Sequence, residues 1–225
     1  MSDRRIEAVN IRARTMFGNV AFSDPLLQLL NYTIVPDQSI CVGKEFVVVV
    51  HVRAEDEMWR NKWRETYGDP LLTQKFMYAL IFSVGLPKSP KQQEKLKNES
   101  RVHGDVLQAD YMDTYRNLTL KQLAELRYVV SSCQNVKAVV KLDDDVGWDD
   151  SHKTGMEPFK ISYSLCRIDD VFITGVLTNA SNVTVEHFHG IDVRRKKIAS
   201  NKDVFFSVHK EHIIYWFLTY NRNVL

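Results

Sequence analysis

The sequence predicts an α/β fold with a mainly parallel central sheet, on the evidence of two apolar runs and the elements between them. Residues 46–50 form a continuous valine-rich run, which is typical of a strand buried on both faces of a parallel sheet. Residues 138–146 begin with a second such run and end in three adjacent aspartates before a final valine. Strands and helices alternate between these runs, and that alternation favours a parallel sheet over an antiparallel one.

The expected elements can be placed along the chain from their periodicity and their end signals. An amphipathic helix over residues 55–67 is ended by Gly68 and Pro70, and a second helix over 118–130 carries a leucine stripe. Residues 88–97 are charged and are expected to form an exposed loop or helix. The expected strands cover residues 46–50, 76–84, 105–108, 138–146 and 203–209.

Two regions complete the domain organisation. Residues 1–31 are predicted to be an irregular N-terminal lead-in, and residues 32–225 a single domain. No apolar run approaches the roughly 20 residues of a membrane span. The first 20 residues lack the apolar stretch of a secretory signal.

The composition gives little information about binding partners, but the cysteines and glycosylation sequons give information about the cellular compartment. The chain has 225 residues, 44% of them hydrophobic, and a net charge of +2, so nothing in it demands nucleic acid or an anionic membrane. Its three cysteines, Cys41, Cys133 and Cys166, fit neither a zinc pattern nor a disulfide framework, although they leave room for one pair. Five Asn-X-Ser/Thr sequons, at residues 31, 98, 117, 179 and 182, favour a lumenal chain.

The aspartate triplet 143–145 is the main candidate site. Three adjacent carboxylates after a buried strand raise one another's pKa unless a cation neutralises them. A hard divalent ion prefers such oxygen ligands, and ligands of open α/β sheets bind beyond the carboxyl ends of the strands. The triplet therefore predicts a metal site that holds a phosphate-bearing substrate; the alternative is a solvated acidic turn.

Other polar residues have a functional and a structural interpretation each. Arg60 and Arg64 lie one turn apart and could contact a diphosphate, or could form a solvated basic helix face. Asp169 and Asp170 could supply a general base, or could begin a helix. His209 ends the last predicted strand, where a surface position competes with a metal-ligand role.

Four ordered blocks of the sequence resemble glycosyltransferase family 31, the β-1,3-galactosyl- and N-acetylglucosaminyltransferases. Residues 60–68 are similar to the family's R-x-x-I-R-x-T-W-G. Residues 103–121 follow Y-G-D-I-x-x-x-D-F-x-D-S-Y-x-N-L-T-L-K almost residue by residue, and this long block decides the assignment. Residues 141–146 match the D-D-D block, and residues 168–175 resemble E-D-V-x-x-G.

The resemblance implies a GT-A fold, in which a Rossmann-like domain binds a UDP-sugar with a divalent metal, usually Mn²⁺. It implies a metal held by Asp143, Asp145 and His209, and a catalytic base at Asp170. The substrate-binding positions that it implies are Arg60, Arg64, Asp110, Lys121, Asp143 and Asp144. A metal held by carboxylates would stabilise the charge on the leaving diphosphate, and a separate carboxylate would deprotonate the acceptor hydroxyl.

The sequence also departs from the family pattern. Only residues 147–167 separate the D-D-D and E-D-V blocks, which indicates an internal deletion on the acceptor side. Asp169 replaces the glutamate of E-D-V, and we expect no counterpart of the family's N-terminal membrane anchor in these residues.

These observations predict a metal-dependent, inverting hexosyltransferase that transfers galactose or N-acetylglucosamine from a UDP-sugar to a glycan in β-1,3 linkage. The acceptor would be a glycoprotein or glycolipid, and the resemblance implies the Golgi lumen or membrane. The alternative is a catalytically weak or inactive relative that binds UDP-sugar or a partner protein, because the deletion removes acceptor-side elements while the nucleotide half keeps its motifs.

Overall fold

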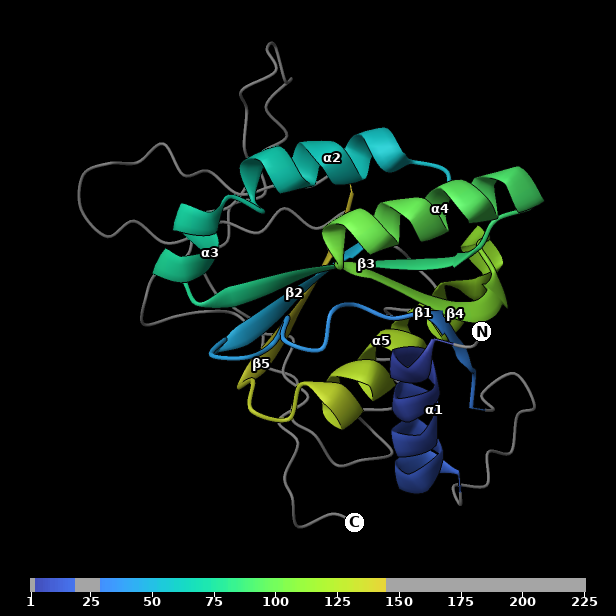
Figure 1. Cartoon of the computed structure of the whole chain (residues 1–225), viewed down its shortest axis with the longest axis horizontal. Helices are drawn as coiled ribbons and strands as arrows, with labels where there is room; N and C mark the ends of the chain where they lie inside the picture. The colour runs from blue at the N-terminus through green and yellow to red at the C-terminus, as the bar shows by residue number, and fades with distance from the viewer. Residues whose placement is uncertain (1–2, 19–28, 145–225) are drawn as a thin grey trace, which may run out of the picture. The chain divides into compact units, whose positions relative to one another are not determined.

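A computed structural model describes residues 3–18 and 29–144 of the chain (Figure 1). The chain divides into two units at Leu142, and the fold below is that of the first unit together with the end of its last strand. The strand predicted over residues 203–209 and the interval 147–167 lie outside the described residues.

The described part contains a five-stranded sheet of order β1-β4-β3-β2-β5. The central strands β2, β3 and β4 are parallel to one another, and the short edge strand β1 is antiparallel to β4. Lys137, just before β5, donates its backbone N–H to the carbonyl of Glu45, just before β2, at 2.6 Å. These two strands therefore begin at the same edge and run the same way. The strands are β1 (Tyr32–Ile34), β2 (Phe46–His51), β3 (Tyr78–Leu86), β4 (Val106–Met112) and β5 (Ala138–Asp143).

Helices cover both faces of this sheet, with α2 and α4 over one face and α1 and α5 over the other (Figure 1). Successive side chains of a strand point to opposite faces, so a strand that is covered on both sides must be apolar at almost every position. In β2 the five residues from Val47 to His51 are all buried, which explains the continuous run in the sequence. The helices are α1 (Arg4–Phe17), α2 (Glu57–Thr66), α3 (Pro70–Lys75), α4 (Pro90–His103) and α5 (Leu118–Ser132), with a 3₁₀ turn at Tyr115–Asn117.

The α/β fold with a mainly parallel sheet is thus confirmed, and it is consistent with a GT-A, Rossmann-like domain. The predicted helices over 55–67 and 118–130 and the strand over 46–50 agree with α2, α5 and β2 within two residues. The strand predicted over 76–84 begins two residues late, and residues 88–97 belong largely to the helix α4.

The expectation of an irregular lead-in is wrong for residues 4–17, which form the helix α1. Asp3 caps it by accepting the backbone N–H of Arg5 at 2.9 Å, and Val9 and Ala13, one turn apart, are buried in the core. The side chain of Asn10 accepts the N–H of Tyr32 at 2.7 Å and donates to its carbonyl at 3.0 Å. Asn10 therefore satisfies the outer edge of β1, where no further strand pairs within the described residues.

A disulfide joins Cys41 to Cys133, with a separation of 92 residues along the chain. Cys41 lies in the loop before β2, and Cys133 is the C-cap residue of α5. The bond ties the end of α5 to the loop that precedes β2. Disulfides persist in oxidising compartments, so this pair agrees with the lumenal setting that the sequons favour.

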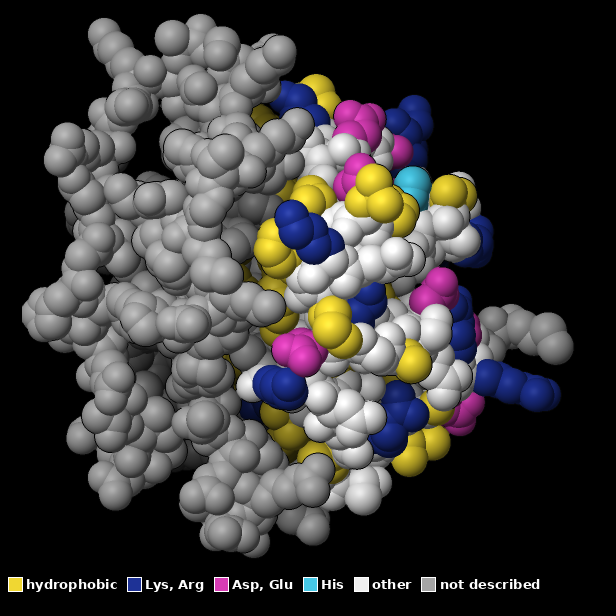
Figure 2. All heavy atoms as spheres, turned by 90° about the vertical axis from the view of Figure 1, so that its left-hand side faces the viewer, with side chains coloured by type: hydrophobic (Ala, Val, Ile, Leu, Met, Phe, Trp, Pro, Cys, Tyr) yellow, Lys and Arg dark blue, Asp and Glu magenta, His cyan; other side chains and the backbone are white. Residues whose placement is uncertain are grey.

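On the face shown in Figure 2, basic, acidic and apolar side chains of the described part are interspersed, and no large patch carries charge of a single sign. This agrees with the small net charge of the chain. Among the helices described, none combines the length and the apolar character that a membrane crossing requires.

Candidate functional site

The strand order places a topological switch point between β2 and β5. From β2 the chain adds β3 and then β4 in one direction, and it returns through α5, on the opposite face, to place β5 on the other side of β2. Ligands of open α/β sheets bind outside the carboxyl ends of the strands at such a point. The carboxyl ends here are His51 of β2 and Asp143, the first aspartate of the triplet, at the end of β5.

Asp113, which follows β4, ties together the carboxyl ends of three strands. Its Oδ2 accepts the backbone N–H groups of Ala54, after β2, and Gly85, in β3, both at 3.0 Å. Its Oδ1 lies 2.8 Å from Nζ of Lys121, and that ammonium also donates to the carbonyl of Val52 at 3.0 Å. The side chains of Asp113 and Lys121 are each 4% exposed. This buried pair fixes the loop after β2 against the neighbouring strands and α5.

Arg60 of α2 also bonds to the loop after β2. Its Nη1 donates to the carbonyl of Arg53 at 2.7 Å and its Nη2 to the carbonyl of Ala54 at 3.1 Å. Its Nε and Nη2 form a bidentate pair with Glu99 of α4 at 2.7 and 2.6 Å. Arg60 is 1% exposed, so α2 presents a buried cation here and not the solvated basic face that was the structural interpretation.

Arg64, one turn further along α2, extends the network. It pairs bidentately with Asp105, just before β4, at 2.7 Å for both bonds, and it donates to Glu99 and to Asn61 at 2.7 Å. Its guanidinium lies 5.0 Å from the ring centroid of Phe82 in β3. The donors of both arginines are thus engaged within the protein, and these contacts support a structural role; their predicted role as substrate-binding residues stays a prediction.

We expect the free energy of unfolding of the Glu99→Gln variant to fall less steeply than that of the wild type as the pH is lowered. Burial raises the pKa of Glu99, but hydrogen bonds and charge from Arg60 and Arg64 outweigh it and hold the pKa below the ordinary value of 4.5. Stability from this carboxylate is therefore fully present above the unfolded pKa and is lost as pH falls through the lower, folded pKa. One such group contributes a slope of at most about 1.4 kcal/mol per pH unit.

Urea unfolding of both proteins between pH 7 and pH 3 measures this slope. Glu99→Gln should be less stable than the wild type at pH 7 and should lose less on acidification. Glu94→Gln, at a 60%-exposed position of the same helix, is the matched control and should follow the wild type. If the free energies of unfolding of Glu99→Gln and the wild type fall in parallel as pH is lowered, the pKa of Glu99 is not held below its ordinary value.

His51, the last residue of β2, and Glu125 of α5 form a second buried polar pair. His51 Nε2 lies 2.6 Å from Glu125 Oε2, and the two side chains are 3% and 0% exposed. Burial, followed by the positive charges of Lys141 and Lys121, holds the pKa of His51 well below its ordinary value, although a neighbouring carboxylate alone would raise it. We therefore assign a neutral imidazole, whose Nε2–H donates to the carboxylate of Glu125.

The remaining predicted site residues fall into two groups. Asp110 is exposed on β4, where its carboxylate accepts the backbone and side-chain N–H groups of Asn31 at 2.9 and 3.0 Å, so its contacts fasten the β1 edge. Asp143 and Asp144 lie at the end of β5 and just after it, and both are partly buried. Asp145, Asp170 and His209 lie outside the described residues, and their metal and catalytic roles stay predictions.

Sequence reasoning missed Asp113, Glu99 and the His51–Glu125 pair. Asp113 is part of the long family block, so the block itself was an available signal. Glu99 sits in a charged segment that resembles any exposed helix, and only its contacts with α2 distinguish it.

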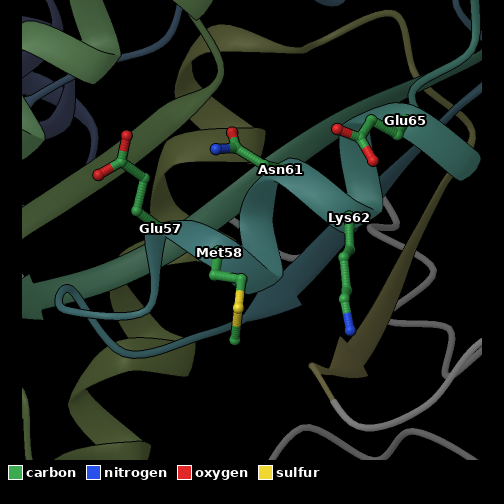
Figure 3. Close-up of a pocket in the computed structure, with 5 residues that line it drawn as sticks. All are labelled: Glu57, Met58, Asn61, Lys62 and Glu65. Carbon is green, nitrogen blue, oxygen red and sulfur yellow. The ribbon is translucent and has the colours of Figure 1, made fainter.

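An open hollow of about 480 Å³ lies along α2 (Figure 3). Its described lining comes from one helix and carries both charge signs and one methionine, so the lining alone does not define a ligand. The lining residues are Glu57, Met58, Asn61, Lys62 and Glu65.

The mainly parallel sheet, its two helical layers and the switch point are consistent with a GT-A, Rossmann-like α/β domain. Residues 58–151 match the galactosyltransferase family model. This segment contains three of the four sequence blocks, those at residues 60–68, 103–121 and 141–146.

The similarity to individual proteins covers about half of the chain or slightly less. It is 34% identical over 117 residues to beta-1,3-galactosyltransferase 4 of Rattus norvegicus, which is 50% of this chain and 31% of that protein. It is 31% identical over 100 residues to beta-1,3-galactosyltransferase 1 of Homo sapiens, which is 44% of this chain and 31% of that protein. The matched segment thus spans about a third of the length of these relatives.

Proposed function

We propose that the protein is a hexosyltransferase that transfers galactose, or N-acetylglucosamine, from a UDP-sugar to a glycan hydroxyl in β-1,3 linkage. The observation that carries the proposal is the galactosyltransferase match over residues 58–151, which includes the switch point's strand β5 and the aspartates at its end. The names of the similar proteins support galactose as the donor sugar. The acceptor would be a glycan on a protein or lipid.

The chemistry of the donor set fits a divalent cation such as Mn²⁺. Asp143 and Asp144 offer carboxylate oxygens at the end of a sheet strand, and such oxygens are the ligands that Mg²⁺ and Mn²⁺ prefer. When bound, the ion would supply positive charge opposite the leaving diphosphate. The residues proposed to hold it are Asp143, Asp145 and His209, and Asp170 is proposed to accept the proton of the acceptor hydroxyl.

A lumenal, Golgi location is part of the same proposal. The Cys41–Cys133 disulfide and the five sequons both suit a compartment that is oxidising and that glycosylates proteins. Such a location would also give the protein access to glycan acceptors.

We expect Asp145→Ala to abolish Mn²⁺-dependent binding of UDP, because the diphosphate would lose the charge that compensates it. Calorimetric titration of UDP into the full chain, with Mn²⁺ and with a chelator, measures this. Asp149→Ala, four residues away in the same acidic segment, is the control and should retain binding. Equal UDP affinity in the Asp145→Ala variant and the wild type would reject the metal assignment.

Release of UDP from UDP-galactose and UDP-N-acetylglucosamine, with and without a glycan acceptor, tests the activity. Acceptor-dependent release supports a transferase. UDP binding with no acceptor-dependent release would instead favour the inactive, UDP-sugar-binding relative.

A further inference from the structure

Three of the five sequons begin within the described residues, at positions 31, 98 and 117. An N-linked glycan is bulky, is attached through the side-chain nitrogen Nδ2 of the asparagine, and needs open surface around it. Two of these nitrogens already bond within the protein. Asn31 Nδ2 donates to Asp110 Oδ2 at 3.0 Å, and Asn117 Nδ2 donates to the carbonyl of Met112 at 2.9 Å.

Asn98, in the helix α4, is held through the other end of its amide. Its Oδ1 accepts from Arg101 Nη1 at 2.6 Å, and because a guanidinium only donates, this contact fixes which end of the amide carries the nitrogen. Within the described part of the chain, Asn98 Nδ2 has no hydrogen-bond partner. The residue is exposed, so the nitrogen is accessible while the amide itself is oriented.

The helix places Asn98 on its solvent-facing side. Leu96 and Glu99 are the buried residues of α4, and Asn98 lies about 160° around the helix from Leu96. Its neighbours one turn further on, Arg101 and Val102, are 67% and 78% exposed. The helix forms part of the outer layer over one face of the sheet (Figure 1). A glycan at this position would therefore extend into solvent without displacing any packed side chain.

Asn98 also lies away from the candidate site. The helix α4 leads from the end of β3 to the start of the parallel strand β4, so it begins at the carboxyl edge of the sheet and ends at the opposite edge. Asn98 follows Pro90, the first residue of the helix, by about 12 Å along the helix axis. A glycan there should leave the carboxyl ends of the strands open.

We propose that Asn98 carries an N-linked oligosaccharide. The proposal rests on the lumenal location that is part of the proposed function. In the modification, Asn98 Nδ2 forms a bond to the anomeric carbon of a lipid-diphosphate-linked oligosaccharide, and the bond from that carbon to the diphosphate oxygen breaks. The leaving diphosphate keeps the bonding electrons, and Nδ2 gives up one proton to the solvent. Ser100 supplies the hydroxyl that the sequon requires.

Expression of the full chain in a eukaryotic cell, behind a cleavable secretory signal, tests the proposal. Peptide N-glycosidase converts each glycosylated asparagine to aspartate, and mass spectrometry of proteolytic peptides, compared with an untreated sample, should show this conversion at position 98. On electrophoresis, Asn98→Gln and Ser100→Ala should each lose one glycan relative to the wild type. Ser100→Thr is the matched control and should retain the glycan, because it keeps a hydroxyl at the third position of the sequon.

An unconverted position 98 in the wild type, or an unchanged number of glycans in Asn98→Gln, would show that Asn98 is not modified and that the proposal is wrong. The proposed function is tested separately on the same preparations. Acceptor-dependent release of UDP by the wild type supports it, and absence of that release rejects it whatever the state of Asn98. Asn98→Gln should release UDP at the rate of the wild type, because the residue lies away from the carboxyl ends of the strands.

Discussion

Replacement of Arg60 by methionine is expected to lower the free energy of unfolding by about 3–5 kcal/mol, the usual cost of removing one partner of a buried ion pair. The side chain of Glu99 is 3% exposed, so its carboxylate cannot regain through water the two bonds that Arg60 supplies. The carbonyls of Arg53 and Ala54 lose their donors as well. Methionine retains most of the aliphatic stem, so the change reports on the charge and its bonds.

Urea denaturation at pH 7 measures the loss, and the double variant Arg60→Met with Glu99→Gln isolates the pair. Because the double variant removes both charges of the pair between α2 and α4, it should be more stable than the sum of the single changes predicts, by about 1–3 kcal/mol. Arg101→Met, at an exposed position of α4, should stay within about 0.5 kcal/mol of the wild type. Strict additivity of the two single changes would show that the pair contributes no coupling.

The elements that the sequence predicted best are those whose burial is uniform. Every residue of β2 from Val47 onward is buried because helices cover both faces, and the strand accordingly carries an uninterrupted run of valines, which is typical of a central parallel strand. The helix α1 was missed because only Val9 and Ala13 of its 14 residues are buried. Two buried positions do not produce a helical period, and packing against α5 and β1, not local preference, accounts for the helix.

The sequence predicted the strand that ends in the aspartates, but not the contacts that the helix arginines make. The run that ends in the aspartate triplet does become β5, beside β2, and open α/β sheets bind ligands beyond the carboxyl ends of strands at such a switch point. The helix arginines, however, meet Glu99 and Asp105, which lie 35 to 41 residues further along the chain. Spacing within a helix identifies neighbours on the same helix, whereas the partners that decide whether an arginine is structural come from tertiary packing.

Removal of the Cys41–Cys133 disulfide is expected to lower the free energy of unfolding by about 4–5 kcal/mol. The bond closes a loop with a separation of 92 residues, and in the chain-entropy model the stabilisation grows with the logarithm of that length. The two cysteines are 8% and 3% exposed, so alanine is the suitable replacement, because a buried serine would add the cost of an unpaired hydroxyl.

The double variant Cys41→Ala with Cys133→Ala should therefore unfold at a lower urea concentration than the wild type under oxidising conditions. Addition of dithiothreitol should bring the wild type close to the variant and leave the variant itself unchanged. Cys166→Ala, at the third cysteine of the chain, is the control and should keep the sensitivity of the wild type to the reductant. If reductant shifts the double variant as much as the wild type, another thiol accounts for the effect. If it shifts neither, the link between α5 and the loop before β2 contributes nothing to stability, and the argument from this disulfide for an oxidising compartment loses its basis.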